Sequence, residues 1–235
     1  HTRCLSDWSS DVCSSDLEVL ASGKIENAGK YIFSVNVKTD MAEVNKAPSF
    51  LYMKGDANGW NGYDVLECVN EEGTQFRGFM YLNQNGFKFT TASDWSGTGY
   101  GANFDTAPGA DNIVMTEPAG YYQVDVDLSA KTYTLTPITT IGIIGSAAPN
   151  GWDSDVDLTY NVEERCWEVK DIKLEEGECK FRANDAWKMQ WGYDGEKFVF
   201  SNNAPAVQFI PEAGTYDIKL YAWITGYAKC EFIKK

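Results

Sequence analysis

Histidine is nearly absent from this chain: among 235 residues the only one is His1. A mechanism that needs an imidazole base, or a zinc site with histidine ligands, therefore lacks its residue. No apolar run approaches the roughly 18 residues of a membrane-spanning helix. Positive charge is scarce as well, because 20 Lys and Arg face 34 Asp and Glu, for a formal net charge of −14. Such an acidic chain repels phosphate backbones and acidic polysaccharides, which argues against nucleic acid as a partner.

Cysteine patterns that signal chemistry are also missing. None of the six cysteines forms a CxxC pair, and the four that follow residue 17 are too few for a disulfide scaffold of two domains. Buried free thiols are the favoured interpretation. One disulfide among the last three stays open as the alternative. The four cysteines are Cys68, Cys166, Cys179 and Cys230.

Acidic residues form no recognisable catalytic or metal-binding pattern. The stretch WDSDVDL at 152–158 places Asp153, Asp155 and Asp157 at alternate positions, which can offer oxygen ligands to calcium. It lacks the glycine and the glutamate that an EF-hand loop requires, so a solvated strand face is favoured. Glycoside hydrolysis needs two carboxylates across a cleft, and the repeats described below offer no acidic pair at matching offsets. We therefore expect no enzymatic activity and no cofactor.

The first seventeen residues differ from everything that follows. The stretch DWSSDVCSSDL, residues 7–17, corresponds to the translation of a common sequencing-adapter end, and the segment has no periodic apolar pattern. We interpret residues 1–17, which include the only histidine, as an adapter-derived artefact. A genuine Ser/Asp-rich leader is the alternative.

An internal repeat organises the rest of the chain. Segments that begin at Ala28, Ala119 and Ala213 each read as a glycine, an alternating run, a polar turn and a second alternating run, which is typical of a hairpin with one buried face. After the first two hairpins come FLYMKGDANGW (50–60) and IGIIGSAAPNGW (141–152), each an apolar strand that enters a turn ending on tryptophan.

The spacing inside the repeat is conserved between its two complete copies. KFTTASDW (88–95) in the first corresponds to KFRANDAW (180–187) in the second. In both copies 28 residues separate the turn tryptophan from the lysine of this segment, and 7 separate that lysine from the next tryptophan. A repeat of about 90 residues is long enough for each copy to be a whole domain.

Short alternating strands with frequent turn signals, and no convincing 3.6-residue period, predict an all-β protein. We expect two tandem immunoglobulin-like antiparallel β-sandwich domains, at residues 47–136 and 137–235. Residues 18–46 then hold only the closing hairpin of a preceding domain, so we expect this chain to be the C-terminal part of a longer protein.

Each copy gathers aromatic and cationic residues near one loop-bearing edge. The negative face of an aromatic ring attracts the C–H groups of a sugar, and Lys or Arg donates hydrogen bonds to hydroxyl oxygens. An acidic background does not repel an uncharged glycan. The alternative is that the tryptophans belong to the core and the cations to the solvated surface. We expect Tyr100 and Trp191 to be exposed. The candidate carbohydrate-binding residues are Trp60, Lys88, Trp95 and Tyr100 in the first domain and Trp152, Lys180, Arg182, Trp187 and Trp191 in the second.

FLYMKGDANGW…FKFTTASDW and IGIIGSAAPNGW…KFRANDAWKMQWG resemble the tandem domains of SusE/SusF-like outer-membrane starch-binding lipoproteins of the Bacteroidetes, over residues 47–235. The resemblance implies a non-catalytic protein that is lipid-anchored through a missing N-terminus and exposed on the cell surface. It would hold starch, by default, or another neutral glycan beside an outer-membrane transport complex. It also implies that paired aromatics with a Lys or Arg form the sites, although Thr90 stands where the second copy has Arg182.

A structural or protein-docking array of β-sandwiches at the outer membrane is the alternative function, because exposed aromatics also mark protein interfaces. One flat aromatic patch would favour docking, whereas separate sugar-wide clefts would favour glycan binding.

Deleting residues 1–17 should leave the melting temperature unchanged, because a segment without periodic apolar residues contributes nothing to a core. Thermal unfolding of the full chain and of the chain that begins at residue 18, in the same buffer, measures this. A drop of several degrees on deletion would contradict the artefact interpretation.

Overall fold

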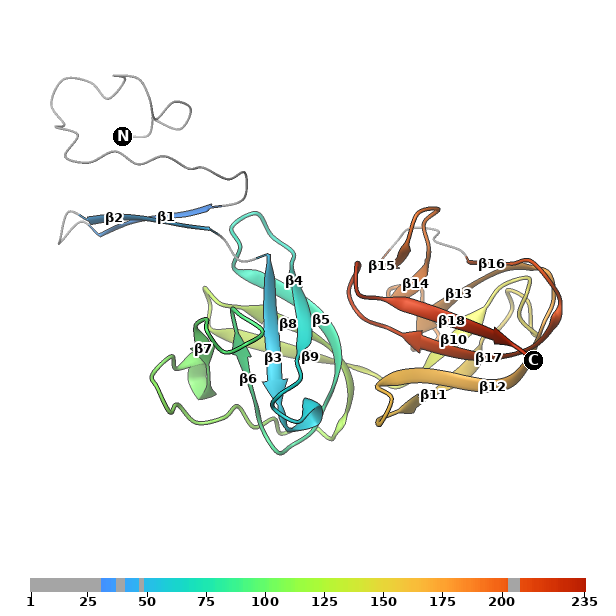
Figure 1. Cartoon of the computed structure of the whole chain (residues 1–235), viewed down its shortest axis with the longest axis horizontal. Helices are drawn as coiled ribbons and strands as arrows, with labels where there is room; N and C mark the ends of the chain where they lie inside the picture. Colours follow the sequence, from blue (N-terminus) through green and yellow to red (C-terminus); the bar gives the residue numbers. More distant parts are fainter. Residues whose placement is uncertain (1–30, 37–40, 47–48, 203–207) are drawn as a thin grey trace, which may run out of the picture. The chain divides into compact units, whose positions relative to one another are not determined.

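The computed structural model describes residues 31–36, 41–46, 49–202 and 208–235 (Figure 1). Residues 1–17, interpreted above as an artefact, lie outside this range. The chain divides into two compact units, residues 1–47 and 48–235. In the first unit, β1 (Tyr31–Asn36) pairs antiparallel with β2 (Met41–Lys46), where the alternation predicts a hairpin. In the described part of the chain, no helix is long and apolar enough to cross a membrane.

The second unit begins with an antiparallel sheet of seven strands, in the order β7-β6-β3-β4-β5-β8-β9. Two short 3-10 turns, η1 (Asp56–Asn58) and η2 (Ala102–Phe104), interrupt its loops. The strands are β3 (Phe50–Gly55), β4 (Asp64–Cys68), β5 (Gln75–Leu82), β6 (Phe87–Thr90), β7 (Gly99–Tyr100), β8 (Gly120–Asp127) and β9 (Thr132–Ile138).

A nine-stranded antiparallel sheet follows, with the path β15-β14-β13-β10-β11-β12-β17-β18 and with β16 paired to β13. The seven-stranded sheet forms what we call the first domain, and the nine-stranded sheet forms the second domain. Its strands are β10 (Ile141–Ile144), β11 (Val156–Asn161), β12 (Cys166–Leu174), β13 (Gly177–Ala183), β14 (Gln190–Tyr193), β15 (Phe198–Ser201), β16 (Gln208–Ile210), β17 (Gly214–Tyr221) and β18 (Lys229–Lys234).

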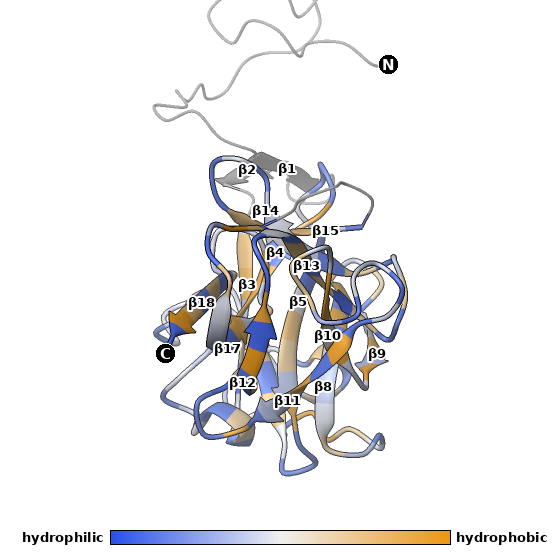
Figure 2. Cartoon of the chain, turned by 90° about the vertical axis from the view of Figure 1, so that its right-hand side faces the viewer, coloured by the Kyte–Doolittle hydropathy of each residue, from blue (hydrophilic) through white to orange (hydrophobic). Residues whose placement is uncertain are grey.

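The prediction of an all-β fold built from antiparallel β-sandwich domains is confirmed. Strand β17 alternates between buried and half-buried residues along most of its length, as a strand with one buried face should. Strands β12 and β18 each carry both hydrophobic and hydrophilic residues (Figure 2). All four cysteines in the described part of the chain are free thiols, so the alternative of one disulfide among the last three is wrong. Burial raises the pKa of Cys179 to about 12, which keeps that thiol protonated and unreactive.

Strand β5 is buried on both faces near its centre. Met80 belongs to the core of the first domain, together with Leu51, Leu66 and Val124. Its neighbour Phe79 points to the opposite face of the sheet, because successive side chains of a strand alternate. There Phe79 joins the core of the second domain.

Aromatic contacts join the two domains at this face. The ring of Phe79 lies edge-on to Trp191 at a centroid distance of 5.2 Å and contacts Phe200 at 4.4 Å. Tyr121 on β8 packs edge-on against Trp167 at 5.5 Å, and its hydroxyl donates a hydrogen bond of 2.9 Å to the carbonyl of Ala222. One face of the first domain's sheet therefore packs into the apolar core of the second domain.

A charged pair also crosses this junction. Asp64, at the start of β4, accepts hydrogen bonds from Arg165 of the second domain and from the amide of Asn58. The side chain of Asp64 is only 5% exposed, whereas that of Arg165 is 31% exposed. Burial raises the pKa of Asp64 above its usual value, while Arg165 and Asn58 oppose that shift. A carboxyl group with a raised pKa stabilises the fold below its unfolded-state pKa, and this contribution is lost as pH rises through the folded-state pKa.

Replacing Arg165 with Met should leave the Asp64 carboxylate buried without its counter-charge. Its pKa should rise further, so that the loss of stability is present at neutral pH and shrinks as acid protonates Asp64. We expect the free energy of unfolding at neutral pH to fall by roughly 2 kcal/mol, less than for a fully buried pair because Arg165 is partly exposed. Urea unfolding at neutral and acid pH measures both effects.

Arg77→Met provides the matched control for this experiment. Arg77 pairs with Asp125 within the first domain, with side chains 28% and 31% exposed. A pair this exposed should contribute only about 0–1 kcal/mol, and its loss should depend little on the burial of a charge. Equal losses for the two variants, or a pH-independent loss for Arg165→Met, would contradict the role given to Asp64.

Candidate functional site

Two tryptophans of the first domain lie together, as the repeat spacing suggests. Trp60 follows the turn after β3, and Trp95 belongs to the loop after β6. Their rings are stacked at a centroid distance of 6.4 Å and an interplanar angle of 22°. Both residues have left-handed backbone conformations, with φ of 62° and 67°. Such conformations are strained for bulky residues and persist only where the surroundings impose them.

Asn58 holds the turn that presents Trp60. Its side-chain oxygen accepts from the Gly55 amide at 3.0 Å, and its side-chain nitrogen donates to Asp64 and to the Met53 carbonyl, each at 3.0 Å. Gly59 takes the left-handed conformation that ends η1. The position of Trp60 is thus fixed by backbone and amide hydrogen bonds and does not depend on a ligand.

The cation beside Trp95 is Lys54, which is not among the residues predicted from the sequence. Its ammonium donates to the carbonyl of Ser93 at 2.7 Å and lies 5.3 Å from the centroid of Trp95 and 5.9 Å from that of Tyr63. These distances permit cation–π attraction to both rings. A lysine in the otherwise apolar strand FLYMKG was the available signal, because a buried lysine needs a partner.

Lys88, the predicted cation, does not lie at the tryptophan pair. It stands directly opposite Lys54 in the β3–β6 pairing, but its ammonium donates to the carbonyl of Ala110 at 2.5 Å. Tyr100, predicted to be exposed, is half-buried and packs against Phe104, with a centroid distance of 6.3 Å. Burial raises the pKa of its hydroxyl. Both residues therefore support the loops of the first domain instead of the tryptophan pair.

The second domain brings four of its five predicted residues together, Trp191 being the exception. Trp152 and Trp187 are both exposed. The largely buried ammonium of Lys180 lies 6.0 Å from the centroid of Trp152 and 5.2 Å from that of Trp187, and it donates to the side-chain oxygen of Gln190 at 2.8 Å. Burial lowers the pKa of Lys180. Gln190 in turn donates to the Trp187 carbonyl at 2.6 Å, which ties the loop to the strand that carries it.

Arg182 backs the ring of Trp187. Its guanidinium carbon lies 4.5 Å from the ring centroid, while two of its nitrogens donate to the two oxygens of Asp155, each at 2.9 Å. This hydrogen-bonded partner lowers the pKa of Asp155. Gly142 makes room for the pair, because a Cβ at that position would lie 2.6 Å from the Cβ of Asp155. A bidentate pair of this kind fixes the plane of the guanidinium, and through it the ring.

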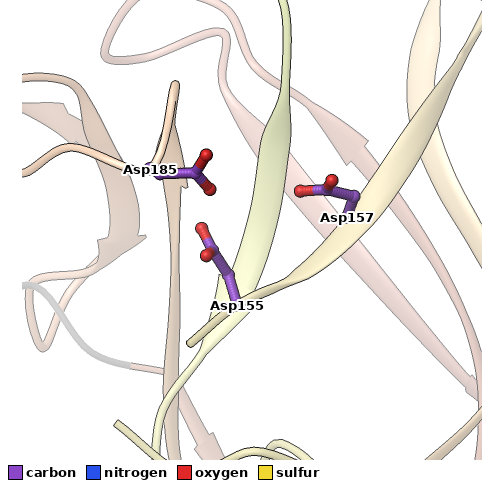
Figure 3. A group of neighbouring side chains, drawn as sticks. All are labelled: Asp155, Asp157 and Asp185. Carbon is purple, nitrogen blue, oxygen red and sulfur yellow. The ribbon is translucent and has the colours of Figure 1, made fainter. Parts of the chain in front are cut away.

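Asp155, Asp157 and Asp185 form an acidic group whose carboxylate oxygens lie within 4.8 Å of one another (Figure 3). Burial, followed by repulsion from Asp185 and Asp155, raises the pKa of Asp157. Arg182 engages both oxygens of Asp155, so this member of the group is the counter-charge of the arginine. The Asp153 that completed the candidate calcium pattern is not part of the group.

Trp191 is the clearest error among the predicted site residues. Its side chain is 0% exposed, and its indole nitrogen donates to the carbonyl of Trp223 at 3.0 Å. The polar residues before it favoured exposure, but Trp191 belongs to β14 and packs against Phe79 of the first domain. Its ring cannot meet a ligand and instead anchors the loop that contains Trp223.

The two sites use different residues at equivalent positions of the sheet. Opposite Lys88 stands Lys54 in the first domain, and opposite the equivalent Lys180 stands Ile144. The cation therefore comes from β3 in one domain and from β13 in the other. Where the second domain has Gly142, Arg182 and the paired Asp155, the first domain has Tyr52 opposite Thr90, with Tyr63 packed edge-on against Tyr52 at 5.3 Å.

No protein-family model matches this chain, and the comparison with curated proteins gave no significant match. The assignment of a role to either site therefore depends on its geometry and chemistry and on the motif resemblance described above.

Substituting Ala for Trp191 should lower the free energy of unfolding by about 3–5 kcal/mol, because it leaves a large cavity in the core of the second domain, where Phe79 of the first domain also packs. The same substitution at Trp187 should cost far less, since that ring is exposed. Urea unfolding of both variants measures the difference. Equal losses would show that the two rings do not differ in their structural role.

Proposed function

We propose that this protein binds a neutral polysaccharide without catalysis, by default starch or another α-glucan, through one site in each domain. The observation that carries the proposal is the repeated placement of a buried ammonium beside exposed tryptophan rings. The Lys54 ammonium lies beside Trp95, and the Lys180 ammonium lies beside Trp152 and Trp187, although the two lysines come from non-equivalent strands. Packing alone would not require a cation at both places, whereas a sugar site uses it in each.

The chemistry of both sites suits a pyranose ring. Indole faces attract the C–H groups of the sugar, and ammonium and guanidinium groups donate to its hydroxyls. A sugar sandwiched between two rings needs van der Waals contact on each side, or about 7–8 Å between ring planes. The 6.4 Å separation of Trp60 and Trp95 is less than this, so the first site would take a sugar on the outer surface of the pair.

The second site offers more free donors than the first. In the described part of the chain, the Lys180 ammonium donates one hydrogen bond, whereas Lys54 donates to both the Ser93 and the Asn61 carbonyls. Within the described residues, no ring contact joins Trp152 to Trp187. The second site is therefore the better candidate for a sugar that lies between its rings.

The cellular role is proposed from the motif resemblance. A lipid-anchored position on the outer membrane, beside a glycan transport complex, would place both sites where polysaccharide is captured. A protein-docking array remains the competing function. It would need the aromatics of both sites in one flat patch, whereas the exposed tryptophans of the two sites lie beside separate ammonium groups.

Replacing Trp152 or Trp60 with Ala should weaken glucan binding at the altered site by about 2 kcal/mol or more, which is roughly thirtyfold. Calorimetric titration with maltoheptaose and with soluble starch measures each single variant and the double variant. Thermal melts should stay close to wild type, because these rings contribute little to the core.

Phe209→Ala is the control for this titration. Phe209 on β16 is exposed but contributes to neither site. Its removal should leave binding unchanged. If the double tryptophan variant binds glucan as wild type does while its melt is intact, these two rings are not the sugar platforms.

A further inference from the structure

A pocket with a volume of about 230 Å³ lies at the junction of the two domains. Its lining consists of Tyr63, Asp64, Val65 and Phe79 from the first domain and of Arg165, Trp223 and Tyr227 from the second. Ligand sites occur preferentially at such domain junctions. None of these residues belongs to the two sites described above, except that Tyr63 borders the first.

Tyr63 connects this pocket to the first site. The Lys54 ammonium lies between the rings of Trp95 and Tyr63, at 5.3 Å and 5.9 Å from their centroids. The same tyrosine then lines the junction pocket. Tyr63 is therefore a ring that the first site and the pocket have in common, and Tyr227 and Trp223 line the same pocket.

The far wall of the pocket is held rigidly by both domains. Trp223 and Tyr227 belong to the loop between β17 and β18. The carbonyl of Ala222 accepts the Tyr121 hydroxyl, the carbonyl of Trp223 accepts the Trp191 indole, and Tyr227 packs edge-on against Phe50 at 5.9 Å. A wall positioned before the ligand arrives loses little conformational entropy on binding.

We propose that this pocket is a further sugar subsite, which extends the first site across the domain junction. A glucan chain stacked on Trp60 and Trp95 would continue over Tyr63 and place a following sugar ring between Tyr63 and Tyr227. This inference rests on the proposed function, since it assigns the pocket the same ligand class.

The polar groups of the pocket suit a sugar better than a purely apolar ligand. Arg165 has five N–H donors, and one of its nitrogens engages Asp64, so the others can donate to sugar hydroxyls. Tyrosine hydroxyls can both donate and accept. Flat rings on two sides with hydrogen-bonding groups between them are the arrangement that a pyranose needs.

The subsite is specific to the first domain. The position that corresponds to Tyr63 after the turn tryptophan is Asp155 in the second domain, where it binds Arg182. At this position the second site therefore has a carboxylate in a salt bridge, whereas the first site has an aromatic ring. The two sites should consequently respond differently to the length of the glucan.

Calorimetric titration with maltotriose and maltoheptaose tests the subsite in the full chain with Trp152→Ala and Trp187→Ala, which disable the second site. In this background maltoheptaose should bind about tenfold more tightly than maltotriose, because only the longer chain reaches the pocket. Adding Tyr227→Ala should remove that tenfold preference and leave maltotriose affinity unchanged. Adding Tyr193→Ala, the matched control with the same 39% exposed fraction, should preserve it.

Two results would overturn the subsite. One is a maltoheptaose preference that survives Tyr227→Ala, with Trp223→Ala as the second variant should Tyr227→Ala lower the melting temperature. The other is an equal loss of affinity for both oligosaccharides, which would assign the pocket to domain packing. If the unmodified protein binds neither glucan, the proposed function fails. If it binds both without regard to length, only the subsite fails.

Discussion

The two-sided burial of the first domain's sheet is the constraint on which the rest of residues 48–235 depends. On strand β5, Met80 packs into the core of the first domain, whereas Phe79 packs into the core of the second. Tyr121 on β8 also packs into the core of the second domain. An aromatic side chain buries about 150–250 Å², at about 25 cal/mol for each Å² removed from water. An isolated first domain would expose these rings. Because the second domain covers them, its β17–β18 loop is brought beside Tyr63, and the junction pocket exists as a consequence of packing.

The same physical requirement is met by different residues in the two sites. An ammonium group removed from water needs hydrogen-bond acceptors and a favourable electrostatic environment. Lys54 finds them in backbone carbonyls and two aromatic faces, and Lys180 in the Gln190 side chain and two tryptophan rings. The tryptophans occupy equivalent sequence positions in the two domains, whereas the cation comes from β3 in the first domain and from β13 in the second. The combination of rings and charge, and not one sequence position, therefore defines the arrangement.

The all-β fold, the pair of Trp60 and Trp95, and the group of Lys180 and Arg182 around Trp187 could be predicted from the sequence, because alternation and spacing are local properties. The errors have tertiary causes. Lys54 and Lys88 share one face of the β3–β6 pair, so alternation cannot decide which ammonium turns towards Trp95 and which towards Ala110. Trp191 follows polar residues and precedes a glycine, yet Phe79, more than a hundred residues earlier, buries it. No local pattern contains that contact. Lys54 was accessible in principle, as the one cation of an apolar strand.

The packing of the two domains against each other also changes what the two proposed sugar sites would do together. Sites on flexibly linked domains must give up the freedom of the linker each time one polymer occupies both. Here the charged pair between Asp64 and Arg165, the Tyr121 hydrogen bond and the Phe79 contacts hold both domains in one compact unit. Part of the conformational entropy of fixing the two domains relative to each other is therefore lost during folding and not during binding. A polysaccharide that extends from the first site into the junction would gain each further contact at little additional entropic cost, which favours long chains over short ones.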